Sequence, residues 1–392
     1  MNQQMMGEIA WAIGQFFLHP LFYAAIVAAI LTGYFRVKKE RSHFKTRLTW
    51  GWSEVRGILK DSWVFSLGLS GIFLLLGIVI YPEFLVLWSI VALFALLIFH
   101  FQYLSGAYLI PVAAGLWWLF HSLSYTVSIK VFQLSGELFA LQHLWPLGLL
   151  AGLFLIAESF FVRRQGNDIL SPQMVTTKRG GSAVQYRIKR LWLIPVVLLI
   201  PGDWFGTIPT YWPVVSFGEQ TFALMAIPFL TGYQQTFRKS YPFEILPQRS
   251  KEFFILGIAT AITAVFGILL PWLAVVSLIL VFIGKIILDL KSRQYQTTGS
   301  FAVVQTTEGV QIAGVLAGSP AEKMGLQIGE RIVKVNGQRI HDEQGLYEAI
   351  QINAAHCRLE VLDHNNELRL KQHVIFRHDH HRLGLLLARP SL

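Results

Sequence analysis

The stretch FFILGIATAITAVFGILLPWLAVVSLILVFIGKIIL, residues 253–288, carries a single charged side chain, Lys285. A helix needs about 20 apolar residues to cross the hydrocarbon core of a bilayer, so this stretch is long enough for a crossing or more. The stretch 64–80 has the same character. Because a chain in lipid must satisfy its own backbone hydrogen bonds, and neither run alternates like a barrel strand, both stretches predict membrane helices.

The composition of the whole chain agrees with a membrane protein. Its 392 residues are 54% hydrophobic and only 14% charged, which is not the balance of a soluble domain. We expect an all-α polytopic bundle of eight or nine transmembrane helices over residues 1–290. His19 and Pro20 interrupt the first candidate span, and three prolines make the sixth short, broken or kinked. The nine candidate spans are 14–35, 63–80, 84–104, 107–127, 144–162, 191–208, 219–237, 253–270 and 272–288.

Charge predicts the orientation of the bundle. Lysine and arginine gather in the connections 36–60, 163–190, 238–251 and 285–293, and even numbers of candidate spans separate these connections. The positive-inside rule therefore places all four in the cytoplasm, where they can also attract anionic membrane lipid. The net charge of +10 is thus explained by orientation, and no nucleic-acid partner is expected. Cys357 is the single cysteine, so no internal disulfide is possible, which suits a cytoplasmic C-terminus.

A second, soluble domain is predicted over residues 296–392, where continuous apolar runs give way to short alternating strands and turn signals. Ser319 can cap a helix that begins at Pro320, with Glu322 as the capping-box partner. The dipeptide at 336–337, Asn-Gly, tolerates the positive φ of a tight turn. The expected strands are 310–316, 331–335, 357–362, 367–371 and 382–388, and a second helix is expected at 342–351.

The string GSPAEKMGL at 318–326, followed by Gly329, Glu330 and VKVNG at 333–337, resembles a bacterial PDZ domain. Domains of this kind bind an extended peptide as an added strand at the edge of their sheet, in a groove that a helix closes on the other side. The resemblance implies a small α/β fold whose activity is protein binding.

The resemblance also implies where the peptide binds. The turn that cradles a carboxylate with backbone amides is a Gly between apolar residues, and Leu383, Gly384 and Leu385 have that form. The segment 299–301, Gly-Ser-Phe, is the competing candidate and corresponds to another circular order of the strands. With the first placement, Leu346 and Ile350 on the second helix either face the peptide or pack in the core.

The sequence offers one catalytic alternative. Gly68-Leu69-Ser70-Gly71 matches the GxSG string of rhomboid-like intramembrane proteases, and His100 and His121 lie in later spans. Small residues are also common in membrane helices because they permit close packing, and we find no other feature of that family. None of the twelve histidines has the spacing of an HExxH zinc motif. We therefore expect no enzyme, with a PDZ-bearing serine protease as the alternative.

The remaining ionisable residues suggest no cofactor, metal or small-molecule substrate. Glu158 and Asp203 lie in or near candidate spans, where a charge is costly, and we expect both close to an interface. A transporter with a regulatory PDZ domain, a third interpretation, would need more polar groups at midplane depth. Four histidines near the end could form a metal site but fit a solvated loop better: His373, His378, His380 and His381.

Over its whole length the chain resembles the MinJ family, membrane proteins of Bacillus-type bacteria that end in a PDZ domain. The strings FFLHPLFY at 16–23 and GYFRVKKER at 33–41 carry most of this resemblance. It implies an adaptor in division-site selection that connects a DivIVA-like scaffold to a MinD-like ATPase and meets other division proteins. It further implies a cell-membrane protein at septum and poles, with its PDZ domain in the cytoplasm and no catalytic residues.

Overall fold

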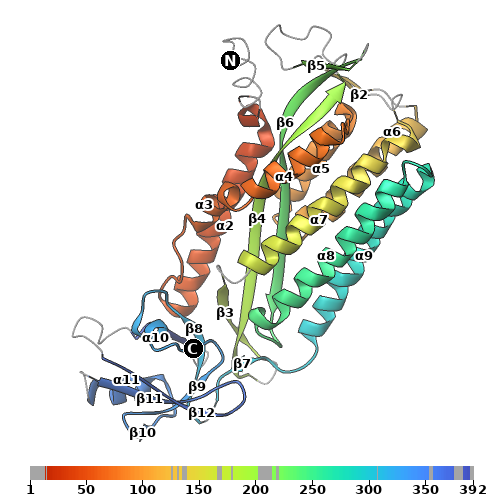
Figure 1. Ribbon diagram of the computed structural model, residues 1–392. Helices are drawn as coiled ribbons and strands as arrows, with labels where there is room; N and C mark the ends of the chain where they lie inside the picture. Colours follow the sequence, from red (N-terminus) through yellow and green to blue (C-terminus); the bar gives the residue numbers. More distant parts are fainter. Residues whose placement is uncertain are drawn as a thin grey trace.

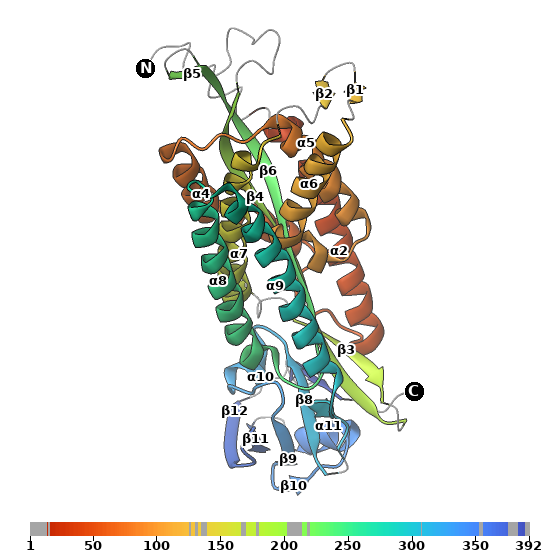
Figure 2. The ribbon, with the colours of Figure 1, turned by 90° about the vertical axis from the view of Figure 1, so that its right-hand side faces the viewer.

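Helices dominate the larger part of the molecule. The computed structural model describes residues 14, 16–124, 127–129, 132–134, 139–165, 170–177, 180–201, 214–217, 220–306, 308–352, 356–374 and 383–388. The helices of the larger part are α2 (Pro20–Phe44), α3 (Ser53–Lys60), α4 (Trp63–Leu75), α5 (Pro82–Leu97), α6 (Gly106–Ser122), α7 (Trp145–Gln165), α8 (Pro242–Phe266) and α9 (Pro271–Thr297). We call the described part of 14–304 the helical body. A smaller domain lies at one end of it (Figures 1 and 2).

Four helical segments among the described residues are long and apolar enough to cross a membrane, and α5 is a shorter apolar helix. The four are Pro20–Phe44, Ser53–Leu75, Leu141–Arg164 and Pro271–Thr297. The outer surface of the body is also apolar, since Leu75 is 89% exposed, Leu97 82% and Leu269 76%. Such a surface suits lipid better than water. The expected number of eight or nine membrane helices is not confirmed.

The described parts of two predicted membrane helices, 191–208 and 219–237, are strands, which corrects our expectation for 191–201 and 220–237, while 202–208 and 219 lie outside the described residues. The strands β4 (Ser182–Pro201) and β6 (Gln220–Phe237) pair antiparallel from Tyr186 opposite Phe237 to Pro201 opposite Phe222. This long ribbon runs beside the helices through most of the body (Figure 1). Three short strands extend its sheet: β3 (Ser171–Thr176), β5 (Val214–Phe217) and β7 (Val303–Val304).

The ribbon is buried on both faces, and this explains why its sequence resembles a membrane helix. On β4 the side chains of Leu193, Ile194 and Val196 leave both faces of the strand, and all three are fully buried. Buried and exposed residues therefore do not alternate along this part of the strand. A strand buried on both faces is a continuous apolar run, which hydropathy alone does not distinguish from a helix. Each of the two strands carries a proline, Pro195 directly opposite Pro228, and a proline interrupts the hydrogen bonding of a helix.

Aromatic contacts fix the ribbon against the helices. Trp192 of β4 stacks on Phe161 of α7, with ring centroids 5.0 Å apart. Phe229 of β6 lies 4.3 Å from Trp88 of α5 and 5.2 Å from Phe154 of α7, measured between ring centroids. All five rings are fully buried, and each such ring removes a large apolar area from water. The ribbon is therefore the centre of the body's core.

The C-terminal domain has its own sheet, in the order β12-β11-β9-β8-β13, with β10 paired to β9. Its core is separate from that of the helical body and includes Ile312, Ile332 and Leu359. The strands are β8 (Val310–Val315), β9 (Arg331–Val335), β10 (Gln338–Arg339), β11 (His356–Leu362), β12 (Leu368–Val374) and β13 (Leu385–Leu387). Its helices are α10 (Pro320–Lys323) and α11 (Glu343–Ile352). These elements agree with those expected from the sequence, except that β12 continues to Val374, the last strand is shorter and β10 was not expected.

The helix cap and the tight turn predicted for this domain are both present, with one change at the cap. The Ser319 hydroxyl accepts from the N–H of Glu322, as a helix cap does. The Glu322 carboxylate reaches one residue further back than expected and accepts from the N–H of Gly318, at 2.6 Å. Asn336 and Gly337 have φ of 50° and 86°, the positive values that their turn requires.

The connection between the two parts departs from the predicted boundary at residue 290. Helix α9 continues to Thr297, and the N–H of its C-cap residue, Thr298, donates to the carbonyl of Gln294. The chain then returns to the helical body, because β7 pairs with Ala183 and Val184 at the start of β4. The C-terminal domain therefore follows directly on a segment that is bound to the body's sheet.

Candidate peptide-binding site

The predicted carboxylate-cradling turn lies at the start of β13. Gly384 has φ of 80°, a conformation that glycine adopts without the strain of a side chain. A Cβ at this position would stand 2.2 Å from the Cβ of Ser319, so no larger residue fits without movement. The Gly384 carbonyl accepts from the N–H of Leu316, and the Leu383 carbonyl accepts from the N–H of Ala321. These contacts bind the turn to the segment between β8 and α10.

The strand that follows this turn is a terminal strand of the sheet. One edge of β13 pairs antiparallel with β8, with Leu385 opposite Val315 and Leu386 opposite Gly314. The sheet order assigns no described strand to its other edge. An unpaired strand edge offers the backbone groups to which an extended peptide adds.

The structure brings the apolar residues predicted for the groove into one cluster. Leu346 and Ile350 of α11 are buried in the core of the domain, where Leu383 and Leu385 are also found. The two helix residues therefore pack in the core in this structure, so a peptide side chain would contact them only if α11 moved. The competing segment 299–301 lies elsewhere, since Gly299 is next to the side chain of Lys239 and the following residues enter β7.

The strand β13 contacts two cores at once. Leu385 and Leu387 belong to the core of the C-terminal domain, whereas Leu386 and Ala388 pack with the helical body. Alternation along a strand sends successive side chains to opposite faces, which explains this division. The neighbouring strand β8 also contacts the body. The Tyr186 hydroxyl of β4 donates to the Ala313 carbonyl of β8 at 2.9 Å, and this contact is buried. The strand that carries the candidate binding edge is thus held against the body by one of its faces.

A second contact joins the two parts near Tyr241. Its ring stacks on Phe243, at 5.3 Å between centroids, and lies 4.9 Å from the ring of His364 in the β11–β12 turn. Gly329 has φ of 95°, and a Cβ there would stand 2.3 Å from the Tyr241 hydroxyl. Glycine is required here both for the backbone conformation and for the close approach.

The serine of the protease alternative is placed in a structural role. The Ser70 hydroxyl donates to the Ser66 carbonyl at 2.6 Å and accepts from the N–H of Val197 at 2.9 Å. Both of these partners are main-chain groups, and neither is a base that could activate a nucleophile. Of the two histidines considered, His121 packs on Phe139 and His100 borders a cavity beyond the end of α5. Ser70 therefore joins α4 to β4.

Glu158 is buried between helices. Its carboxylate accepts from Lys285 Nζ at 2.7 Å and from the Ser105 hydroxyl at 2.5 Å. Lys285 also lies 3.8 Å from Asp289, which accepts from Arg249 at 2.7 Å. Because acids and bases alternate in this network, its charges offset one another, as buried ion pairs must. The lone lysine of the 253–288 stretch was the sequence signal for this network.

The other ionisable candidates bring no further site. His373 lies in β12, while His378, His380 and His381 fall outside the described residues, as does Asp203. In the part of the chain that the structure describes, no three side chains of the metal-ligating types come together.

The fold and the site define a class: a protein of several long apolar helices that carries a C-terminal PDZ domain, whose terminal strand β13 pairs with no described strand on its outer edge. A family model described as a PDZ domain matches residues 311–362. The chain is 30% identical to the Cell division topological determinant MinJ of Bacillus subtilis, over all of this chain and 98% of that protein. It is 29% identical to the Probable cell division topological determinant MinJ of Lacticaseibacillus paracasei, over 69% of this chain and 71% of that protein. The chain therefore belongs to the MinJ family, whose members are named as determinants of division topology and not as enzymes.

Proposed function

We propose that this protein is a membrane-anchored adaptor in division-site selection that works by binding and not by catalysis. In this proposal the PDZ domain and the cytoplasmic connections link a DivIVA-like polar and septal scaffold to a MinD-like ATPase. The protein is then a multi-pass protein of the cell membrane, concentrated at septum and poles, with its PDZ domain in the cytoplasm.

The observation that carries the proposal is the position of β13. The turn that precedes this strand has room only for a glycine at position 384. The outer edge of β13 pairs with no described strand. This is the arrangement in which a sheet accepts a peptide as an additional strand, with backbone amides at the turn for a carboxylate. Membership of the MinJ family supports division proteins as the source of that peptide.

The distribution of charge supports the orientation. Helices α2 and α7 carry basic residues in their last turn, among them Arg41 and Arg164, and Arg293 lies one turn before the end of α9. These ends point toward the part of the molecule that carries the PDZ domain (Figure 1). Lysine and arginine concentrate on the cytoplasmic side of membrane proteins. The PDZ domain is therefore proposed to lie on the inner side of the membrane.

Crosslinking in living cells tests the adaptor role. Tyr347 of α11 packs against the domain core beside Leu346, so benzoylphenylalanine at this position places a photoreactive ring next to the proposed groove. We expect it to capture the DivIVA-like or the MinD-like protein. The same amino acid at the exposed Gln338 of β10 is the control, and equal capture from both positions would remove the groove from the proposal.

Localisation tests the role independently of the groove. A fluorescent fusion is expected to concentrate at septa and poles of a rod-shaped Gram-positive host and to lose this pattern when the DivIVA-like scaffold is deleted. A uniform membrane signal that does not change with that deletion would contradict the adaptor role.

A further inference from the structure

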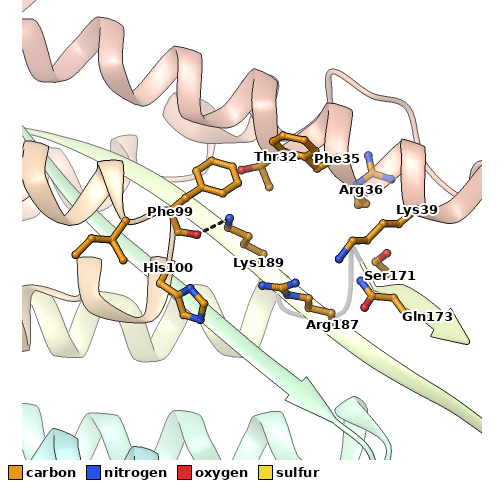
Figure 3. A pocket seen from close by; sticks show the side chains of 11 residues that line it. Thr32, Phe35, Arg36, Lys39, Phe99, His100, Ser171, Gln173, Arg187 and Lys189 are labelled. Atoms are coloured by element: carbon orange, nitrogen blue, oxygen red, sulfur yellow. Dashed lines mark hydrogen bonds between the residues drawn. The ribbon is translucent and has the colours of Figure 1, made fainter. Parts of the chain in front are cut away.

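A cavity of about 350 Å³ opens between α2, the residues after α5, and the strands β3 and β4. Figure 3 shows the side chains of Lys39, Arg187 and Lys189 extending into this space from α2 and β4. We call it the cationic cavity. None of its described lining residues is an acid.

The positive charge of the cationic cavity is not offset by the described residues that line it. Arg36 is the exception, because its guanidinium donates to Glu54 at 2.6 Å and to Glu40 at 3.0 Å. The described contacts of Lys189 are with neutral groups: Nζ donates to the Phe99 carbonyl at 2.7 Å and lies 3.1 Å from the centre of the Phe99 ring. A partly buried cation is costly without an anionic partner.

The two residues of β4 reinforce this imbalance. Arg187 and Lys189 are two positions apart on one strand, so their side chains leave the same face of the sheet. Like charges so placed repel each other, and a shared anion removes the repulsion. Lys39, which is exposed, reaches toward the same space from α2.

Two buried polar atoms in the wall of the cavity have no hydrogen-bond partner within the described chain. They are Nε of Arg187 and Oγ of Ser171, and the two residues stand opposite each other in the β3–β4 pairing. Buried polar groups are nearly always hydrogen-bonded, and both of these atoms belong to side chains that line the cavity, so a rotation toward a ligand's acceptor would give each a partner. A phosphate group offers several acceptor oxygens and the negative charge that an arginine fork matches.

The other face of α2, where Tyr34, Trp50 and Trp52 line a separate pocket, has the character of a membrane interface. Tyr34, Trp50 and Trp52 are 59%, 67% and 58% exposed. Arg36 holds the loop between α2 and α3, which carries both tryptophans, near α2 by donating to the Trp50 carbonyl at 2.9 Å. Tyrosine and tryptophan are enriched at the level of lipid headgroups. The cavity is also bordered by two exposed apolar side chains, Phe35 and Ile98, which suit an acyl chain.

From these observations we infer that the cationic cavity binds a phosphate group, supplied by the headgroup of an anionic phospholipid. The inference rests on the membrane embedding proposed above but not on the division partners. In this site Lys39, Arg187 and Lys189 balance the negative charge of the phosphate, and the Ser171 hydroxyl donates to one of its oxygens.

Thermal unfolding of the full chain in a neutral detergent tests the inference, with phosphatidylglycerol, phosphatidylcholine and inorganic phosphate as probes. We expect phosphatidylglycerol to raise the midpoint temperature at concentrations where phosphatidylcholine does not. Lys39→Gln and Arg187→Gln should each weaken this effect, raising the half-maximal lipid concentration about tenfold, as expected for the loss of a charge-assisted hydrogen bond. Lys39 is exposed, so its substitution keeps the test valid if the Arg187 variant does not fold.

Lys251→Gln is the matched control, since it removes an equal charge from an exposed position of α8 that does not line the cavity. An equal loss in this variant would reduce the effect to general charge attraction and overturn the site. Stabilisation by inorganic phosphate at the same concentrations would overturn the lipid as the source and support the phosphate site. Equal effects of the two lipids, with none of phosphate, would overturn the inference, whereas the localisation experiment would be unaffected.

Discussion

Lys285 Nζ of α9 and Glu158 Oε1 of α7 lie 2.7 Å apart in the interior of the helical body, and both side chains are almost fully buried. Attraction between two charges is strong where water is excluded, but so is the cost of burying either charge alone. The pair therefore couples the packing of α7 and α9 to the presence of both residues.

Replacing one member of this pair is expected to destabilise the protein more than replacing both. Lys285→Met leaves Glu158 without its cation and should lower the free energy of unfolding by on the order of 3–5 kcal/mol. The double variant Lys285→Met with Glu158→Leu should recover most of this loss. Midpoint temperatures of the three proteins in detergent provide the comparison, and a double variant as unstable as the single one would contradict the pairing.

The contact between Tyr186 and the Ala313 carbonyl should hold the PDZ domain against the helical body. Tyr186→Phe keeps the ring and removes the donor, so the buried carbonyl loses its partner at a cost of about 1–3 kcal/mol. We expect faster hydrogen exchange in β8 and β13, with the helices unchanged. Tyr295→Phe, which removes a hydroxyl from a side chain 45% exposed, is the control and should leave exchange as it is.

The turn before β13 offers a test of the groove that uses two glycines with similar backbones. Gly384→Ala places a Cβ 2.2 Å from Ser319, whereas Gly337→Ala meets no atom within 4 Å although its φ is also positive, at 86°. Both variants carry backbone strain, and only the first displaces the turn. We expect capture through the crosslinker at Tyr347 to be lost in the first variant and kept in the second, at equal protein levels. Equal behaviour of the two would show that strain alone matters.

Acid should weaken the β11–β12 hairpin of the PDZ domain through Asp363. The N–H groups of Glu367 and Asn365 donate to its carboxylate, Arg369 pairs with it, and these contacts lower the pKa of the carboxyl group. A carboxyl group whose pKa is lower in the folded state contributes stability above its unfolded pKa, which is about 3.9. That contribution disappears as the pH falls through the folded pKa. Asp363→Asn should therefore lose less stability than the parent protein between pH 5 and pH 3, with the exposed Glu308→Gln as the control.

The single thiol should report on folding and not on the side of the membrane. Cys357 is buried in the PDZ core, and burial raises the pKa of its thiol to about 11, so little reactive thiolate exists at neutral pH. We expect a membrane-impermeant maleimide to label the native protein very slowly and the denatured protein fully. Orientation is then measured with Gln338→Cys in a Cys357→Ala background, where labelling from outside intact cells would contradict a cytoplasmic PDZ domain.

Local signals predicted the PDZ domain well because its structure depends on neighbouring residues. The cap at Ser319 and the turn at Asn336 and Gly337 are properties of short segments, and the sequence shows them directly. The ribbon of β4 and β6 could not be predicted in the same way. Its strands are apolar on both faces, and the distinction from a helix lies in their pairing with each other, which hydropathy does not contain.

Contacts between residues far apart in the sequence could not be predicted either. Glu158 is 127 residues from Lys285 in the chain, so its burial could not be inferred from its own surroundings. Gly384 could be singled out because a glycine between leucines is a local signal, whereas the division of β13 between two cores depends on how the domain docks.

The alternation of Leu385 and Leu386 between two cores has a mechanical consequence. A domain on a flexible tether would present its ligand over a broad range of positions, so the ligand's local concentration would be set by tether length. Here β13, the strand that would receive a ligand, also packs against the helical body. Any chain added to it would acquire a definite tilt and height relative to the lipid, and assemblies of such pairs would inherit a common direction.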